Sequence, residues 1–588
     1  MNRREFMRNS AITMTAAGIS ELKASTEEKT STSLDSLPRV GPKKVVKGKK
    51  AVASSDNPIV TETILNVMKA GGNAVDAAIA GCLTQATVAP HMTNHTGTVM
   101  FLYWEAKTGK SYALDSSGTI VSGMPPFRPV PPGLGVLNSG PVAPMGCIPG
   151  FMPGLSEMHK KFGTKSWSSL CEPAVHWADE GFPISSFQHS VLDEELPMYG
   201  YFPSGRELFT PDGFLPNVGD RLKNPKLADT LRKLSAEGPE YFTKGQWAKN
   251  FVAEANRLGW PIKLDHMTEI PPRWDDPLKY DYNGYEILQF GPPQRQALFT
   301  AYCLNVLNHL NMKSLGHYTK SAESLYYFSQ AMRRAEFELG MLHDPQKFEV
   351  PVDIWMSKDF HRMAAEILKR SMPKIDLTEH VKVTSGNLAL IAAGIPTGKP
   401  DTRAVPSGSC ELSIVDEQGN WVQMMNTLQS GGIPGAVVDG VIMVGSHAET
   451  SMDAAIAGWF SGGCRMRSVY GSTIVLKDGK PILSMGTPGN VFCTIPQVLS
   501  NVLDFNMDPY DAADAPRLLP MRNDYTLAVE SRIPADVLSG LLKLGIQVHT
   551  LQMYDYHMGS FQMSWRDEKT GLMNSCADPR RAGHADGI

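Results

Sequence analysis

The chain has 588 residues, and its 56 Lys and Arg side chains nearly balance 60 Asp and Glu side chains, giving a formal net charge of −4. A charge so close to zero excludes the basic surface that nucleic-acid binding requires. No run approaches the roughly 20 apolar residues of an integral membrane helix, and eight cysteines are too few for a disulfide framework. A hydrophobic fraction of 42% is typical of a globular protein with a sizeable core.

The first 25 residues combine a basic pair with a weakly apolar stretch. Arg3 and Arg4 are followed by Phe6 and then by small and apolar residues. This pattern is typical of a twin-arginine signal, which exports folded proteins from the bacterial cytoplasm. We predict a signal peptide over residues 1–25 and a periplasmic or extracellular protein; the alternative is a basic, disordered start of a cytosolic protein. Residues 26–48 are rich in Ser, Thr, Lys and Pro, and are predicted to be a disordered linker.

Helical and strand patterns alternate along the rest of the chain. Apolar spacing predicts two helices within residues 58–86, and two strands on either side of a turn at 107–110. Two later hairpins are expected to turn at 418–420 and 477–479. Further helices are expected at 168–180, 225–235, 245–258, 296–309 and 321–343. Hairpin-rich sheets covered by helices predict an α+β fold, a four-layer αββα sandwich.

Most standard catalytic signatures are absent from the sequence. It contains no GxSxG elbow, no GxxxxGK[ST] phosphate loop and no HExxH zinc helix. His91 and His95 are four residues apart, but they follow Pro90 in a polar stretch, which favours a loop with ordinary histidines over a metal site. We expect neither a metal nor an organic cofactor.

Gly408, Ser409 and Cys410 open a predicted strand after a polar, proline-containing approach. The Ser409 hydroxyl can attack the Gly408 carbonyl in a strained backbone for which glycine supplies the freedom. Hydrolysis then leaves Ser409 with a free α-amino group of pKa about 7.7–8.0, which is suited to act as a general base. Taken alone, a Gly-Ser pair before a hairpin is usually only a turn.

Further motifs surround this pair. SCELS (409–413), IVDEQGN (414–420) and TLQ (427–429) follow one another, and GGNAVDAAIA (71–80) and IPGFMPGL (148–155) precede them. GPEYFTKG, NGYEILQFGPP, GTPGN and CADPRRAG also occur in order along the chain. Together these motifs resemble the γ-glutamyltransferase family of N-terminal-nucleophile hydrolases, whose small subunit begins with TTHYS, a VVD-x-x-GN hairpin and TLN. The resemblance implies one αββα unit, with residues 49–408 as the large-subunit part and residues 409–588 as the small-subunit part.

The resemblance also implies roles for single residues. Ser409 corresponds to the nucleophile, the Gly408–Ser409 bond to the self-cleaved bond, and Thr427 to the threonine that assists both. Gly489 and Asn490 stand where two glycines donate backbone N–H groups to the oxyanion, each such donor stabilising the intermediate by roughly 3–4 kcal/mol. Asn490 can serve if its φ is not required to be positive.

The sequence departs from the family pattern at the nucleophile and at the substrate end of the pocket. Ser replaces the usual Thr nucleophile, and Cys410 is the alternative nucleophile next door. Ser117 stands where an arginine binds the α-carboxylate of a γ-glutamyl group, and a hydroxyl cannot replace that ion pair, which is worth roughly 1.5–3 kcal/mol. We place Gln429, Glu449 and Ser468 in the same substrate-binding region.

We therefore predict an exported, self-processing amidase or acyltransferase. Its small-molecule substrate would carry an amide or γ-glutamyl-like carbonyl other than that of glutathione, and its fragments would come from one precursor. The alternative is an uncleaved, inactive homologue that acts as a binding or scaffold protein. Glutathione hydrolysis would need another cation, for which Arg465 and Arg467 are the nearest in sequence.

Overall fold

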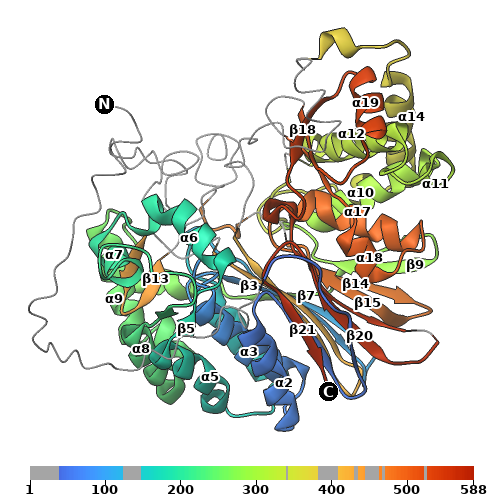
Figure 1. Ribbon diagram of the computed structural model, residues 1–588. Helices are drawn as coiled ribbons and strands as arrows, with labels where there is room; N and C mark the ends of the chain where they lie inside the picture. Colours follow the sequence, from blue (N-terminus) through green and yellow to red (C-terminus); the bar gives the residue numbers. More distant parts are fainter. Residues whose placement is uncertain are drawn as a thin grey trace, which may run out of the picture.

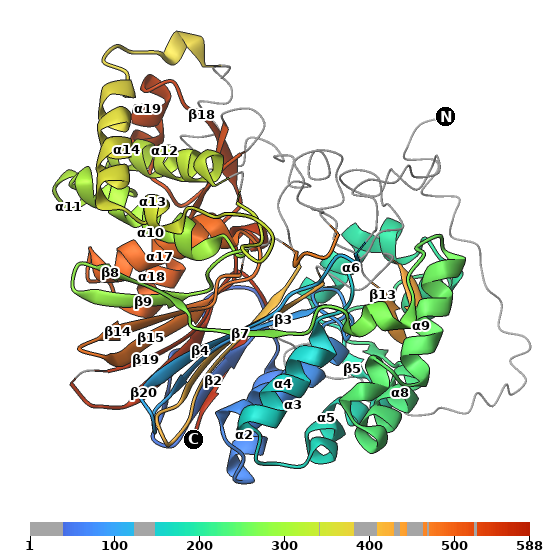
Figure 2. The same ribbon diagram turned by 180° about the vertical axis from the view of Figure 1, so that it is seen from behind.

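A computed structural model describes residues 39–122, 147–339, 342–381, 408–428, 435–443, 462–466, 470–521, 526–567 and 569–588. Two seven-stranded sheets pack face to face at its centre, with helices on both outer sides (Figures 1 and 2). This arrangement confirms the predicted four-layer αββα sandwich. The predicted signal peptide lies outside the described residues.

The first sheet carries the predicted nucleophile. Its strands lie in the order β21–β2–β10–β11–β3–β4–β7. Their bounds are His584–Gly587, Val52–Ser55, Cys410–Val415, Trp421–Thr427, Thr98–Glu105, Lys110–Ser116 and Arg273–Asp275. The helices α2 (Pro58–Lys69), α3 (Ala74–Val88) and α4 (Phe151–Phe162) lie along its outer face. Strands from before and after residue 408 are therefore interleaved within one sheet. The predicted cleavage site, the Gly408–Ser409 bond, does not separate two folding units.

The second sheet has the order β1–β20–β19–β15–β14–β9–β8. Its bounds are Val46–Gly48, Met573–Ala577, Gln562–Arg566, Lys480–Gly486, Thr473–Lys477, Tyr285–Gln289 and Leu278–Tyr282. The helices α10 (Gln296–His309), α17 (Val491–Leu503) and α18 (Pro509–Asp514) pack on its outer face. Because β1 pairs with β20, the ordered chain begins before the predicted end of the linker at residue 48.

Two smaller lobes flank the sandwich (Figure 1). One lobe contains α5 (Trp167–Glu180), α6 (Ser186–Tyr199), α7 (Pro203–Phe209), α8 (Pro225–Glu237), α9 (Gln246–Arg257), η3 (Pro239–Phe242), η4 (Leu264–Thr268), β5 (Phe182–Pro183), β6 (Arg221–Leu222), β12 (Ala436–Val438) and β13 (Val441–Met443). The other contains α11 (Met312–Leu315), α12 (Ala322–Glu338), α13 (Val352–Trp355), α14 (Lys358–Ser371), α19 (Ala535–Lys543), η5 (Thr378–His380) and the sheet β16–β17–β18 (Leu518–Pro520, Thr526–Glu530, Gln547–Leu551). The short η7 (Tyr556–Met558) contacts α6 of the first lobe through Tyr556. Within the described ranges, no helix is long and apolar enough to cross a membrane.

Candidate active site

Ser409 immediately precedes β10 and is 6% exposed. Its hydroxyl donates to Thr427 Oγ1 at 2.6 Å, and its backbone N–H donates to the Met92 carbonyl at 2.8 Å. The antiparallel register pairs Cys410 with Asn426, so the hairpin that separates Ser409 from Thr427 in sequence brings their hydroxyls together. The structure thus joins two of the predicted catalytic residues.

The backbone at Ser409 has a φ of +100°. A non-glycine residue held in such a sparsely populated region costs of order 1–3 kcal/mol and persists only where its surroundings enforce it. We expected the strain to fall on Gly408, whose φ is not positive. The strained residue is instead the predicted nucleophile, on the C-terminal side of the predicted scissile bond.

Gly97 allows the loop before β3 to pass directly against Thr427. A Cβ on Gly97 would lie 1.9 Å from the Thr427 carbonyl oxygen, which no other residue could tolerate. The Gly97 carbonyl in turn accepts the N–H groups of Gly150 and Phe151 at the start of α4. This chain of contacts fixes the end of β11, and with it the Thr427 hydroxyl.

Gly489 and Asn490 precede the first turn of α17. Gly489 has a φ of +80° and Asn490 a φ of −74°. The positive φ therefore falls on the glycine, and Asn490 adopts a backbone conformation that a non-glycine residue tolerates. Within the described part of the chain, neither N–H donates to an acceptor, and the positive end of the helix dipole adds to their affinity for an anion.

Arg581 links this loop to Ser409. Its Nη1 donates to the Ser409 carbonyl at 3.2 Å, and its Nη2 lies 3.1 Å from the point that a Cβ on Gly489 would occupy. The predicted oxyanion loop and the predicted nucleophile therefore contact the same guanidinium. Sequence analysis quoted the CADPRRAG motif but assigned Arg581 no role.

Cys410 is fully buried and packs against Ala89, Met92 and Val191. Burial raises the pKa of its thiol well above the ordinary value, which disfavours the thiolate.

Two carboxyl groups that sequence analysis did not select lie at the start of β10: Glu411 is fully buried within the strand, and Asp56 is partly buried next to it. Asp56 Oδ2 accepts the Glu411 N–H at 2.8 Å, and burial raises the pKa of Asp56 to about 6. Glu411 Oε1 accepts from Gln423 and Ser472, and burial raises the pKa of Glu411 to about 8. The sequence alone does not reveal a raised carboxyl pKa, because that shift depends on burial in the folded protein.

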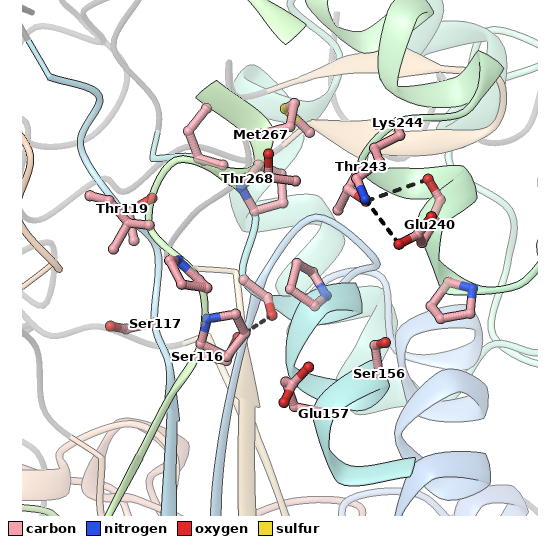
Figure 3. A pocket seen from close by; sticks show the side chains of 18 of the residues that line it. Ser116, Ser117, Thr119, Ser156, Glu157, Glu240, Thr243, Lys244, Met267 and Thr268 are labelled. Carbon is pink, nitrogen blue, oxygen red and sulfur yellow. Dashed lines mark hydrogen bonds and ion pairs between the residues drawn. The ribbon is translucent and has the colours of Figure 1, made fainter. Parts of the chain in front are cut away.

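A pocket of about 180 Å³ opens at the same end of the first sheet (Figure 3). The end of β4 with Ser116 and Ser117 forms one wall, and residues of α4, η3 and η4 form the others. Ser409 and Thr427 do not line it. Neighbouring strands are 4.7–4.9 Å apart, so Ser116, two strands from β11, lies about 10 Å from the end of that strand.

Ser117 and Arg465 are both engaged with neighbouring groups at this pocket. The Ser117 hydroxyl and N–H both donate to Asp115 Oδ1, at 2.6 and 3.0 Å. Arg465 is buried, and its guanidinium donates to the carbonyls of Asp115 and Pro271. The predicted substrate-binding residues Gln429, Glu449 and Ser468 lie outside the described residues, as does Arg467.

His91 and His95 lie in the buried loop before β3. Burial lowers the pKa of each imidazole to about 3, which keeps both rings neutral. Among the described residues, no group of three His, Cys, Asp or Glu side chains is placed to hold a metal ion.

Comparison with known proteins places the chain in a family. The family model described as Gamma-glutamyltranspeptidase matches residues 60–588. The chain belongs to the γ-glutamyltranspeptidase family. It is 25% identical to the glutathione hydrolase proenzyme of Bacillus subtilis, over 93% of each chain. It is 27% identical to that of Pseudomonas aeruginosa, over 91% of this chain and 93% of the relative.

A cephalosporin acylase from Bacillus halodurans has the same fold. Its crystal structure matches with a TM-score of 0.74 and 22% identity, covering 94% of this chain and 98% of that one. Membership of the γ-glutamyltranspeptidase family makes this chain an enzyme of the hydrolase and acyltransferase class. It also confirms the family resemblance that the sequence motifs indicated.

Proposed function

We propose that the protein is a self-processing amidase or acyltransferase with Ser409 as its N-terminal nucleophile. The observation that carries the proposal is the 2.6 Å hydrogen bond between the Ser409 and Thr427 hydroxyls, at a residue with φ of +100° directly after Gly408. Self-cleavage of an internal bond needs both a positioned hydroxyl and a backbone whose release of strain favours the reaction.

Maturation begins when Ser409 Oγ attacks the Gly408 carbonyl carbon. The C–N bond breaks as the nitrogen of Ser409 takes up a proton, and the Gly408 acyl group passes to the oxygen. Water then hydrolyses this ester, leaving a carboxylate on Gly408 and a free amine on Ser409. Thr427 accepts a hydrogen bond from the attacking hydroxyl and so orients it.

Turnover uses the same atoms on a substrate amide. The Ser409 amine takes the hydroxyl proton as Oγ attacks the substrate carbonyl, and the N–H groups of Gly489 and Asn490 stabilise the oxyanion. The amine passes the proton to the leaving nitrogen, and an acyl ester forms on Ser409. Water or an acceptor amine then releases the acyl group. The Met92 carbonyl, which accepts the Ser409 N–H, is placed to orient the amine.

Ser409 is a better candidate than Cys410 for this role. Cys410 lies inside β10, where its N–H and carbonyl belong to the strand and its side chain is covered by an apolar cluster. The raised pKa of its thiol removes the advantage that a thiolate would give.

The acyl group is proposed to differ from the glutamyl group of glutathione. The family relatives named above are glutathione hydrolases, but Ser117 offers a hydroxyl already held by Asp115. Arg465 is the nearby cation, and two backbone carbonyls already bind its guanidinium. An uncharged acyl group avoids burying an α-carboxylate without a partner.

Export through the twin-arginine route is part of this proposal. It rests on the Arg3–Arg4 pair and the apolar stretch that follows. Replacing both arginines with lysines should retain the protein in the cytoplasm of a bacterial host, as measured by fractionation.

The activity is tested with purified protein and a set of p-nitroanilides that carry γ-glutamyl or uncharged acyl groups. We expect the uncharged amides to be cleaved faster, and Ser409→Ala to cleave none. Equal turnover by Ser409→Ala would overturn the proposal, whereas a preference for the γ-glutamyl group would overturn only the substrate assignment.

A further inference from the structure

Arg581 contacts the backbone of the proposed nucleophile rather than its side chain. The guanidinium is 1% exposed; its Nη1 donates to the Ser409 carbonyl at 3.2 Å and contacts Met92 Sδ at 3.6 Å. The Met92 carbonyl accepts the Ser409 N–H. The two backbone groups of the strained residue are thus held from both sides, the carbonyl by Arg581 and the amide by Met92.

The guanidinium is itself held in place by its surroundings. Its Cζ lies 5.7 Å from the centre of the Phe187 ring, and the absence of a side chain at Gly489 leaves room for Nη2. Its charge acts on the carboxyl group of Asp56, which accepts the Glu411 N–H. Arg581 and Asp56 therefore hold two alternate residues at the start of β10, with Cys410 buried between them.

A residue with φ of +100° relaxes toward negative φ unless both of its peptide groups are fixed. A charge-assisted hydrogen bond is about twice as strong as a neutral one, and the planar guanidinium keeps its donor in one direction. Rotation about the Ser409 backbone would break this bond, move the Oγ away from Thr427 and release the strain without cleavage.

We propose that Arg581 is a positioning residue for self-cleavage, which holds Ser409 in its strained conformation before the Gly408–Ser409 bond breaks and keeps the new N-terminal residue in place afterwards. This inference rests on the proposed function, since it assumes that Ser409 is the nucleophile. Arg581 takes no part in the bond changes described above. Its contribution is to the geometry in which Ser409 Oγ attacks.

The pH dependence of cleavage distinguishes a positioning role of Arg581 from a purely structural one, which would leave it unchanged. Arg581 favours the ionised form of Asp56, while burial favours the protonated form. The other polar groups facing Asp56 are Ser560, just before β19, Gln562 of β19, and the titratable Cys410 and Glu411 of β10. The ionised Asp56 carboxylate is the stronger acceptor for the Glu411 N–H, so cleavage is expected to slow as Asp56 becomes protonated. Removing the guanidinium should raise the pKa of Asp56 and so shift this acid limb of cleavage to higher pH.

The test compares Arg581→Met and Arg581→Lys with a matched control, Arg532→Met. Arg532 is a partly buried arginine that pairs with Asp514 and Glu530, and within the described part of the chain it forms no hydrogen bond or ion pair with β10 or Ser409. Cleavage of the full chain is followed on denaturing gels and by intact mass, with thermal unfolding measured in parallel. We expect Arg581→Met to slow cleavage at least tenfold and to shift the acid limb upward. Arg581→Lys should recover part of the rate, and Arg532→Met should cleave as the wild type does.

The outcomes separate this inference from the proposed function. An uncut wild-type chain would overturn both, whereas a cut wild type with an Arg581→Met variant cut at the same rate would overturn the inference alone. If Arg581→Met does not fold, the cleavage rate of Arg581→Lys and the pH dependence of cleavage in Asp56→Asn test the inference instead. A wild-type rate in Arg581→Lys, with an unchanged acid limb in Asp56→Asn, would contradict the role.

Discussion

The two ends of the proposed reaction site differ in how closely they follow the family pattern. At the nucleophile, Ser409 and Thr427 are 2.6 Å apart, and Gly489 and Asn490 have free N–H groups within the described chain. At the proposed acyl-binding end, the Ser117 hydroxyl is bound to Asp115 and the two Nη atoms of Arg465 donate to backbone carbonyls. Only about 10 Å separates the end of β11 from the end of β4.

This difference indicates which part of the chemistry the chain retains. The bond-breaking groups are set by hairpin register and by close glycine packing, so they are tied to the fold itself. The acyl-binding groups project from loops and strand ends, where a single replacement changes specificity without disturbing the sheets. This contrast supports the proposal of a retained mechanism with an altered substrate over loss of catalysis.

The nucleophile end is tested most severely by Ser409→Ala. Loss of the attacking oxygen should leave the chain uncut and lower amide hydrolysis by roughly 10⁴-fold or more. Gel analysis and p-nitroanilide assays measure the two effects. Cys410→Ala is the matched control and should cleave normally; if it is the uncut variant instead, the nucleophile is Cys410.

Thr427→Val tests the partner hydroxyl while keeping the branched shape. Removing the acceptor of the Ser409 hydrogen bond should lower kcat by about 10²–10³-fold, in the range of a lost general-acid or general-base contact. Thr427→Ser restores the hydroxyl and should recover most of the rate. A Thr427→Val enzyme with unchanged kcat would show that the 2.6 Å contact has no part in catalysis.

At the acyl end, Ser117→Arg is expected to bring back recognition of a carboxylate. A charge-assisted pair contributes about 1.5–3 kcal/mol, so turnover of a γ-glutamyl anilide should rise at least tenfold relative to an uncharged anilide. Ser116→Ala at the neighbouring position serves as a control and should leave this ratio unchanged. No change with Ser117→Arg would mean that the pocket at β4 does not contact the acyl group.

The smallest expected effect concerns stability rather than catalysis. The pKa of Glu411 is about 8 in the folded protein against an ordinary 4.5, so the folded state keeps a proton that the unfolded state loses. Stability therefore falls as pH rises from about 4.5 to about 8. Glu411→Gln mimics the protonated acid and should remove about 1–3 kcal/mol of this fall between pH 6 and 8. Denaturant unfolding at several pH values measures it; a parallel pH dependence in both proteins would contradict the assignment.

Sequence reasoning predicted part of the fold, but it missed α4, α14 and α19 although their sequences are amphipathic. Both hairpins and the helices α2, α3, α5, α8, α9, α10 and α12 follow from apolar periodicity and turn residues. Helix α17 was missed: its sequence, VFCTIPQVLSNVL, is buried on nearly all sides and contains Pro496, a residue type that usually ends or kinks a helix.

Residues of the site could be predicted only where they stand at a position that corresponds to a functional residue of the family motifs. Ser409 and Thr427 were assigned from their positions in the SCELS and TLQ motifs, and the hairpin between them brings their hydroxyls together. Arg581 contacts the Ser409 carbonyl and Asp56 the Glu411 N–H from opposite ends of the chain, and no local pattern signals that approach. The positive φ of Ser409 likewise could not be assigned from Gly408 alone, because Met92 and Arg581, which bind the backbone of Ser409, are far from it in the sequence.

The central claim is that Ser409 becomes an N-terminal nucleophile by self-cleavage. The intact mass of the purified protein, read together with N-terminal sequencing, tests it most directly. The account requires two fragments, of which the smaller comprises residues 409–588 and begins with Ser409. A single uncut chain, or a small fragment that begins with Cys410, would contradict it.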